Sequence, residues 1–184
     1  MNRKNNESLF KKQRNVRPVI EDAVSEALNG DTLTNAQNFI SYLRKNKMTP
    51  GWASANSWKV SYKGKGVYYI RLPGTAWYPL DADSWNLSVF AQYDENLREL
   101  ISGESEEIKE LVHANNNFPC GGCMSGLDRK SVSKNFSNIC ACTCINIKNP
   151  DDSLCGFAIK LIALRREAIT NDRVPKCCYV KPSK

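Results

Sequence analysis

The chain has 184 residues, of which 41% are hydrophobic and 24% are charged, and its net charge is +7. This length fits one domain with an ordinary core, and no apolar run approaches the roughly 20 residues that cross a bilayer. No hydrophobic segment follows the charged start, so we expect no secretory signal and predict a cytoplasmic chain. Its eight cysteines are then expected to be thiols or metal ligands, not disulfides.

The positive charge lies at the two ends of the chain. Residues 1–17 carry a net charge of +5 and residues 172–184 carry +3, whereas the body between them carries −1. A nucleic-acid-binding face usually concentrates basic residues on the folded body, so this distribution argues against a nucleic-acid partner. We expect a disordered or loosely attached basic arm at 1–15, a single α+β domain at 16–170 and an irregular basic tail at 171–184.

The domain is predicted to begin with a pair of helices. Apolar residues recur at spacings of three and four over residues 19–28, and Gly30 is placed to end this helix. A second helix is predicted with Thr34 as its N-cap and to stop at Thr49-Pro50.

The hydrophobic period then changes to two, which is typical of strands. Residues 58–63 alternate between apolar and polar, and residues 67–72 return after a glycine-rich turn at 64–66. A third strand is predicted over residues 85–90. The short connections favour an antiparallel meander of at least three strands.

Aromatic residues crowd the predicted sheet and its loops. Aromatic side chains on an antiparallel sheet can line a ligand pocket, although they more often fill the core. The sequence therefore offers a candidate surface for a small-molecule or protein ligand, made by Trp58, Tyr69, Trp77 and Trp85.

Helical spacing returns after the sheet. Apolar residues follow a helical period from Asp94 to Val112, with a weak point at 102–103. A closing helix is predicted with Asn149 as its N-cap, Pro150 at its first position and two arginines near its end.

Five of the eight cysteines lie between residues 120 and 144. Cys120 and Cys123 flank two glycines, which permit the sharp turn that two thiolates need around one zinc ion. After a gap typical of a second ligand pair, Cys140, Cys142 and Cys144 share one face of a strand predicted over 139–147.

Strand geometry limits which of these thiols can share an ion. Cys140 and Cys144 would lie about 13 Å apart in an extended strand, too far for two Zn–S bonds of about 2.3 Å. The sequence therefore predicts a structural zinc site made by Cys120, Cys123, Cys140 and Cys142, with Cys144 as the alternative to Cys140.

Two alternatives to zinc stay open. Cys120 and Cys123 could form a redox dithiol, but such centres are expected near a βαβ pattern, whereas this sheet is predicted to be antiparallel. The strand cysteines could also be buried core residues, as free cysteines often are.

Met48-Thr-Pro-Gly-Trp52, Trp58-Lys-Val-Ser-Tyr-Lys-Gly-Lys65 and Ser84-Trp85 resemble the opening of a group of small uncharacterised bacterial proteins. Phe136-Ser-Asn-Ile-Cys140, Asn149-Pro-Asp151 and the helix to Arg165-Arg166 resemble their ending, and the resemblance covers about residues 35–170. In that group a C-x2-C pair and a later single cysteine recur, which match Cys120, Cys123 and Cys140 of this chain. This chain departs from the group by carrying two further cysteines in the predicted strand. The Tyr-Lys-Gly-Lys hairpin is also similar to one in YdhG-like domains of proposed iron-chaperone type. Neither resemblance implies a defined reaction.

These features predict a zinc-stabilised binding or sensing module without catalytic activity. No phosphate-binding glycine loop is present, and a single histidine argues against an open catalytic zinc site. The alternative is a thiol-dependent redox or metal-handling protein that uses Cys120 and Cys123. A nucleic-acid accessory protein is the weaker alternative.

Overall fold

A computed structural model describes residues 3–75, 79–90, 95–115 and 144–173. Three helices precede the sheet, namely α1 (Arg3–Val16), α2 (Ile20–Ala27) and α3 (Gly30–Lys45). The strands are β1 (Thr49–Ser54), β2 (Ser57–Tyr62), β3 (Lys65–Arg71), β4 (Asn86–Phe90) and β5 (Cys144–Lys148). Helices α4 (Glu95–Ser102) and α5 (Glu106–Asn115) lie between β4 and β5, and α7 (Asp152–Thr170) follows the sheet.

The strands form one antiparallel sheet in the order β1-β2-β3-β4-β5, so each strand pairs with its neighbours along the chain. The predicted α+β fold, with N-terminal helices, an antiparallel meander and a closing helix, is confirmed. Strand β1 begins at Thr49, where the sequence predicted only the end of a helix. Pro50 fits this place because β1 is an edge strand of the described sheet, where a missing N–H costs little.

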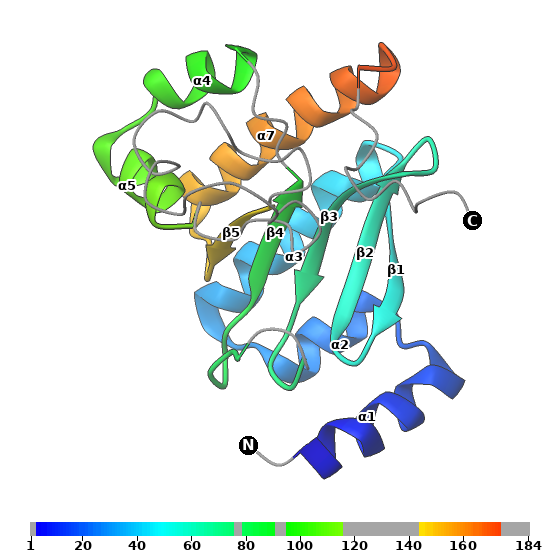
Figure 1. The fold of residues 1–184 in the computed structure, drawn as a ribbon. Helices are drawn as coiled ribbons and strands as arrows, with labels where there is room; N and C mark the ends of the chain where they lie inside the picture. Colours follow the sequence, from blue (N-terminus) through cyan, green and yellow to red (C-terminus); the bar gives the residue numbers. More distant parts are fainter. Residues whose placement is uncertain (1–2, 76–78, 91–94, 116–143, 174–184) are drawn as a thin grey trace, which may run out of the picture.

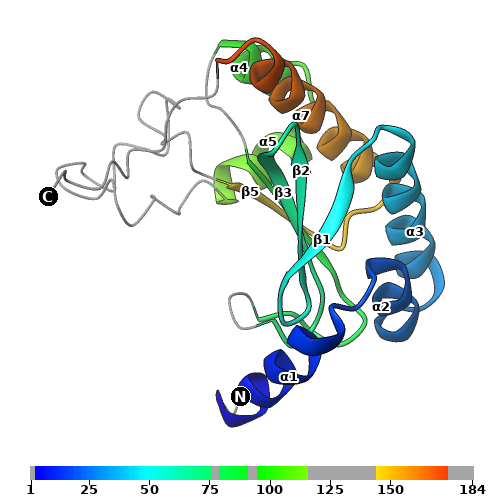
Figure 2. The same ribbon diagram turned by 90° about the vertical axis from the view of Figure 1, so that its right-hand side faces the viewer.

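Figure 2 shows α2 and α3 on one side of the sheet. Helix α7 packs against β3 and β4 and also contacts α3 and α4. One face of the sheet is buried and forms part of the hydrophobic core. It carries two rows of fully buried residues, and each row takes one residue from each of β2, β3, β4 and β5. The rows are Trp58, Ile70, Leu87 and Ile147, and then Val60, Tyr68, Val89 and Ile145. Burying a large apolar side chain contributes about 1.5–3 kcal/mol each, so these rows fix the register of the sheet.

Helix α3 begins at Gly30, four residues before the predicted start at Thr34. Asn29 occupies the N-cap position, and its backbone N–H donates to a carboxylate oxygen of Asp83 at 2.8 Å. The hydroxyl of Thr34 donates instead to the Gly30 carbonyl oxygen, one turn back within the helix. The predicted cap was wrong because a contact across 54 residues holds the start of the helix.

The start of α7 also differs from the prediction. Asp151 is the N-cap residue, and its carboxylate accepts a hydrogen bond from the Leu154 N–H at 2.8 Å. Asn149 lies outside the helix with a φ of 45°. Its side-chain oxygen accepts from the Trp85 N–H at 2.8 Å, and its own N–H donates to the Trp85 carbonyl at 2.8 Å. Asn149 therefore joins the end of β5 to the residue before β4.

Residues 3–16 form helix α1, where the sequence predicted a disordered or loosely attached arm. The helix lies at the lower end of the sheet in Figures 1 and 2, beside the turn between β1 and β2. Gln13 makes the attachment: its side-chain oxygen accepts from the Asn56 N–H at 2.8 Å and from the Trp52 indole N–H at 3.3 Å. The Phe10 and Trp52 rings lie 5.6 Å apart. A polar anchor of this kind leaves little trace in hydrophobic periodicity.

None of the helices in the described ranges is long and apolar enough to cross a membrane.

Candidate functional site

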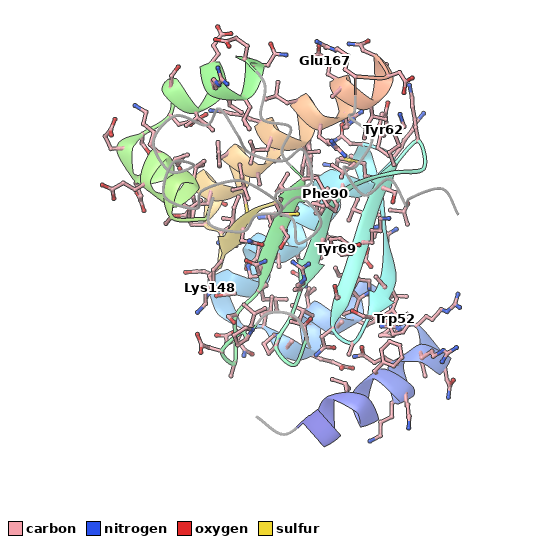
Figure 3. All side chains as sticks on the ribbon, viewed as in Figure 1. Trp52, Tyr62, Tyr69, Phe90, Lys148 and Glu167 are labelled. Atoms are coloured by element: carbon pink, nitrogen blue, oxygen red, sulfur yellow. The ribbon has the colours of Figure 1, made fainter. Side chains whose placement is uncertain are left out.

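The second face of the sheet carries polar, basic and aromatic side chains, and we name it the polar sheet face. One row of paired positions crosses it from Lys59 through Tyr69 and Ser88 to Asn146. On either side of this row lie Arg71 paired with Asn86, and Phe90 paired with Cys144. Figure 3 views the molecule from this side, opposite to α2 and α3, with Tyr69 and Phe90 labelled on the central strands.

Charge is unevenly divided between the sheet and the helices. The five described strands contain no aspartate or glutamate, whereas they contain Lys59, Lys65, Arg71 and Lys148. Lys65 pairs with Asp172 at 2.7 Å and Lys148 pairs with Asp81 at 2.6 Å. Lys59 is exposed and has no ion-pair partner in the part of the chain that the structure describes. The net charge of the chain between its two basic ends is close to zero. This value is therefore the sum of a positive charge on the sheet and a negative charge on the helices and loops.

Two cations and two aromatic rings follow one another along the polar sheet face, and we name them the cation–aromatic row. The Arg71 guanidinium lies over the Tyr69 ring, 5.0 Å from its centroid. The Tyr69 and Phe90 rings are 5.7 Å apart in an edge-to-face arrangement. Arg165 of α7 lies 5.9 Å from the Phe90 centroid and donates to the Gly66 carbonyl oxygen. Both ends of the row are therefore guanidinium groups held near ring faces.

Gly66 has no side chain, and this leaves room for Lys59 beside the row. A Cβ atom at position 66 would lie 3.1 Å from the Lys59 Cε and 3.2 Å from the Phe90 Cε2, tighter than ordinary van der Waals contact. The aliphatic stem of Lys59 thus passes across Gly66 next to Phe90. This packing directs the lysine along the sheet while its residue remains exposed.

A hydrogen-bond network lies beneath the row. The Arg71 Nη1 group and the Asn86 amide both donate to the Ser88 hydroxyl oxygen, and that hydroxyl donates to the Asn146 side-chain oxygen. Asn86 and Ser88 are buried, whereas Arg71 and Asn146 are half-buried. The side-chain oxygen of Asn86 is buried without a hydrogen-bond partner among the described residues. Such an acceptor is costly to leave unpaired, so a water molecule or a ligand donor there would be stabilised.

The two described cysteines are both protonated thiols at neutral pH. Burial raises the pKa of Cys144 to about 11, although Arg71 and Arg165 oppose this shift by favouring the thiolate. Burial also raises the pKa of Cys155 to about 12. Cys155 is a residue of α7 and lies in the core. Neither thiol has the lowered pKa of a reactive nucleophile.

The predicted zinc ligands Cys120, Cys123, Cys140 and Cys142 lie outside the described residues. Cys144 is the first residue of β5 and lies on the polar sheet face, opposite to Ile145 and Ile147 as the alternation predicted. Within the described ranges, no group of three or more His, Cys, Asp and Glu side chains is placed to hold a metal ion. The zinc site stays a prediction.

The predicted aromatic ligand surface is divided by the register of the sheet. Trp58 and Trp85 are fully buried in the core, where the Trp58 indole N–H donates to the Pro18 carbonyl at 2.9 Å. Trp85 packs edge-on against Phe39. The choice of Trp58 and Trp85 for a ligand surface was therefore wrong, whereas Tyr69 does lie on the polar sheet face. Trp77 lies outside the described residues.

Sequence reasoning missed Lys59, Arg71, Ser88, Phe90 and Asn146. The signal was present, because residues that alternate with the buried Trp58, Ile70 and Leu87 must point to the other face. The aromatic residues were predicted to bind a ligand because they carry rings, without regard to the face of the strand on which each one lies.

Comparisons of this chain with protein-family models, with curated proteins and with solved structures found no match. The chemistry of the polar sheet face therefore carries the functional argument.

Proposed function

We propose that the protein is a non-catalytic binding module that holds an anionic ligand on its polar sheet face. The observation that carries this proposal is the cation–aromatic row beside Lys59, on strands without any acidic residue. Guanidinium and ammonium groups attract an anion, aromatic rings supply contact area, and a few polar groups orient the ligand.

Electrostatics favours an anion on this face over an empty face. Lys59 and Arg71 project from neighbouring strands, and the Arg71 guanidinium contacts the Ser88 hydroxyl and the Tyr69 ring. Like charges on one face repel each other, and a bound anion reduces that repulsion. The Asn146 side chain and the unpaired oxygen of Asn86 offer polar groups close to these charges.

The same face has little to offer for catalysis. The strands that the structure describes supply no aspartate, glutamate or histidine, the side chains that most often transfer protons. The one cysteine among its described residues, Cys144, has a pKa raised to about 11 and so carries little thiolate at neutral pH. The proposal is therefore binding without chemistry.

Isothermal titration with adenosine monophosphate and with adenosine at low salt tests this proposal. We expect the phosphorylated compound to bind more tightly than the nucleoside, and binding to weaken as salt is added. Lys59→Ala should reduce the affinity several-fold. Lys45→Ala is the matched control, because Lys45 is an exposed lysine in the last turn of α3. Equal effects of the two substitutions, or equal binding of the two compounds, would contradict the proposal.

We also propose that a structural zinc ion stabilises this module through Cys120, Cys123, Cys140 and Cys142. The support is the C-x2-C spacing around two glycines and the second group of cysteines that follows it. Such a closed four-sulfur site would stabilise the fold and supply no open position for chemistry.

A further inference from the structure

We infer that the anionic ligand of the polar sheet face is a single-stranded nucleic acid that runs along the strands. This inference rests on the proposed function and names its ligand class. It is carried by the exposed basic side chains of α1, the cation–aromatic row and Lys59, which together extend over the length of the sheet.

The aromatic residues occupy positions suited to unstacked bases. Tyr69 and Phe90 come from the adjacent strands β3 and β4, and both are half-buried residues. Single-stranded RNA and DNA are bound on antiparallel sheets and grooves where such rings stack with bases, because every base presents a π-face. A double helix hides these faces, so a duplex would gain little from Tyr69 and Phe90.

Helix α1 extends the positive charge beyond the sheet. Gln13 attaches α1 to the β1–β2 turn, and Arg71 pairs with Ser57, the residue that begins β2 after this turn. Four basic side chains of α1 and its C-terminal end are exposed and form no ion pair with any described residue, namely Lys11, Lys12, Arg14 and Arg17. The basic helix and the Arg71 end of the cation–aromatic row therefore meet at one end of the sheet.

The extent of these charges favours a polymer over a small anion. Strand β2 alone has six residues and so spans roughly 20 Å, and α1 adds charge beyond its first residue. A mononucleotide can contact only part of this length, whereas a strand with a phosphate on every nucleotide can contact all of it. Each phosphate that is neutralised releases counterions, which makes such binding steeply dependent on salt.

The charge count over the whole body, which argued against nucleic acid, averaged two different surfaces. Acidic residues concentrate on helices such as α2 and α5, which carry Glu21 and Asp22, and Glu106 and Glu107, in their first turns. The strands carry no acidic residue. A binding face is judged by its local charge, and the polar sheet face is basic.

Fluorescence anisotropy with labelled oligo-dT and oligo-U of twelve nucleotides tests this inference, with adenosine monophosphate as a competitor. Tyr69→Leu should lower the affinity about five- to a hundredfold without changing the salt slope, because it removes stacking alone. Lys59→Ala should reduce the slope of log K against log salt by about 0.7, the value for one phosphate contact on a single strand. Lys45→Ala should change neither quantity. Circular dichroism melting confirms that each variant is folded.

The outcomes separate this inference from the proposed function. Adenosine monophosphate binding that depends on Lys59, with no tighter binding of either oligonucleotide, would overturn the inference and leave the proposed function standing. Binding of none of these probes would overturn both. A concentration-dependent dimer that Lys59→Ala and Tyr69→Leu dissociate would assign the polar sheet face to a second copy of the chain, and would also overturn the inference.

Discussion

At the scale of single residues, Gln13 is the side chain on which the position of α1 depends. It accepts from Asn56 N–H and from Trp52 Nε1, and its own amide donates to the Asn56 side-chain oxygen at 2.6 Å. These bonds are partly buried, so their loss leaves donors that water satisfies only in part. This glutamine thus attaches α1 together with the ring contact between Phe10 and Trp52.

Gln13→Ala is expected to lower the free energy of unfolding by about 1–2 kcal/mol and to expose α1 to protease. Chemical denaturation measures the first effect and limited trypsin digestion the second. Gln37→Ala is the control, since Gln37 is an exposed glutamine on α3. Unchanged cleavage within α1 in the Gln13 variant would show that its side chain does not hold the helix.

The thiol of Cys144 yields a prediction about pH. Its pKa is raised to about 11 in the folded chain, whereas an unfolded cysteine titrates near 8.5. Folding therefore disfavours the thiolate, so the stability due to this group is fully present below about pH 8.5 and is lost as the pH rises towards 11. Alkylation of Cys144 by iodoacetamide, followed by peptide mass spectrometry, should be slow at pH 8 and accelerate up to about pH 11. A rate that levels off near pH 8.5 would contradict the raised pKa.

At the scale of elements, the start of α7 shows that Asp151, and not the predicted Asn149, caps the helix. Asp151 accepts a hydrogen bond from the Leu154 N–H, whereas Asn149 bonds to Trp85 outside the helix. Asp151→Ala should therefore cost about 1 kcal/mol of stability, the usual effect of losing a cap. Asp152→Ala is the control, because Asp152 also lies in the first turn of α7 but is not its N-cap residue. A larger loss for Asp152→Ala in urea denaturation would refute Asp151 as the cap.

The elements that the sequence predicted are those whose apolar residues follow one period. Strands β2, β3 and β4 and helices α4, α5 and α7 each carry such a pattern, and the structure contains all of them. Strand β1 was missed because Thr49-Pro-Gly51 has the composition of a breaker, and only its pairing with β2 makes it a strand. Helix α1 was missed because its anchor is polar.

The candidate site was harder to predict because it depends on strand register. Tyr69 was chosen for its ring, and its neighbours on the same face became evident only once the pairing of Lys59 with Tyr69 and of Tyr69 with Ser88 was known. Trp58 and Trp85 were chosen for the same reason as Tyr69, and they lie in the core. The buried rows on the other face set the register of the strands. The packing of the core therefore determines which residues lie side by side on the polar sheet face.

At the scale of the whole molecule, the zinc prediction concerns stability and not ligand binding. Elemental analysis of the purified protein should find one zinc per chain. Cys120→Ser and Cys142→Ser should lose this zinc and destabilise the fold, whereas Cys144→Ser should retain it if Cys140 and Cys142 are the second ligand pair. A metal-free protein with a reversible Cys120–Cys123 disulfide would favour the redox alternative.

The division of charge between sheet and helices is the property of the whole molecule on which the functional account depends. Helices α2 and α3 cover the apolar side of the sheet, and the strands direct Lys59, Tyr69, Arg71 and Phe90 to the other side. Salt bridges already engage Lys65 and Lys148 at the margins, whereas Lys59 lies beside the cation–aromatic row and forms no ion pair with any described residue.

Chemical-shift mapping tests the central claim most directly, because it locates the ligand on the molecule. Backbone amide spectra are recorded while adenosine monophosphate, and separately oligo-dT, is added at low salt. The account predicts that the largest shifts occur in β2, β3 and β4 around Lys59, Tyr69 and Phe90, and that α3 residues near Lys45 do not move. Shifts confined to the helices, or scattered evenly over the molecule, would contradict a ligand site on the polar sheet face.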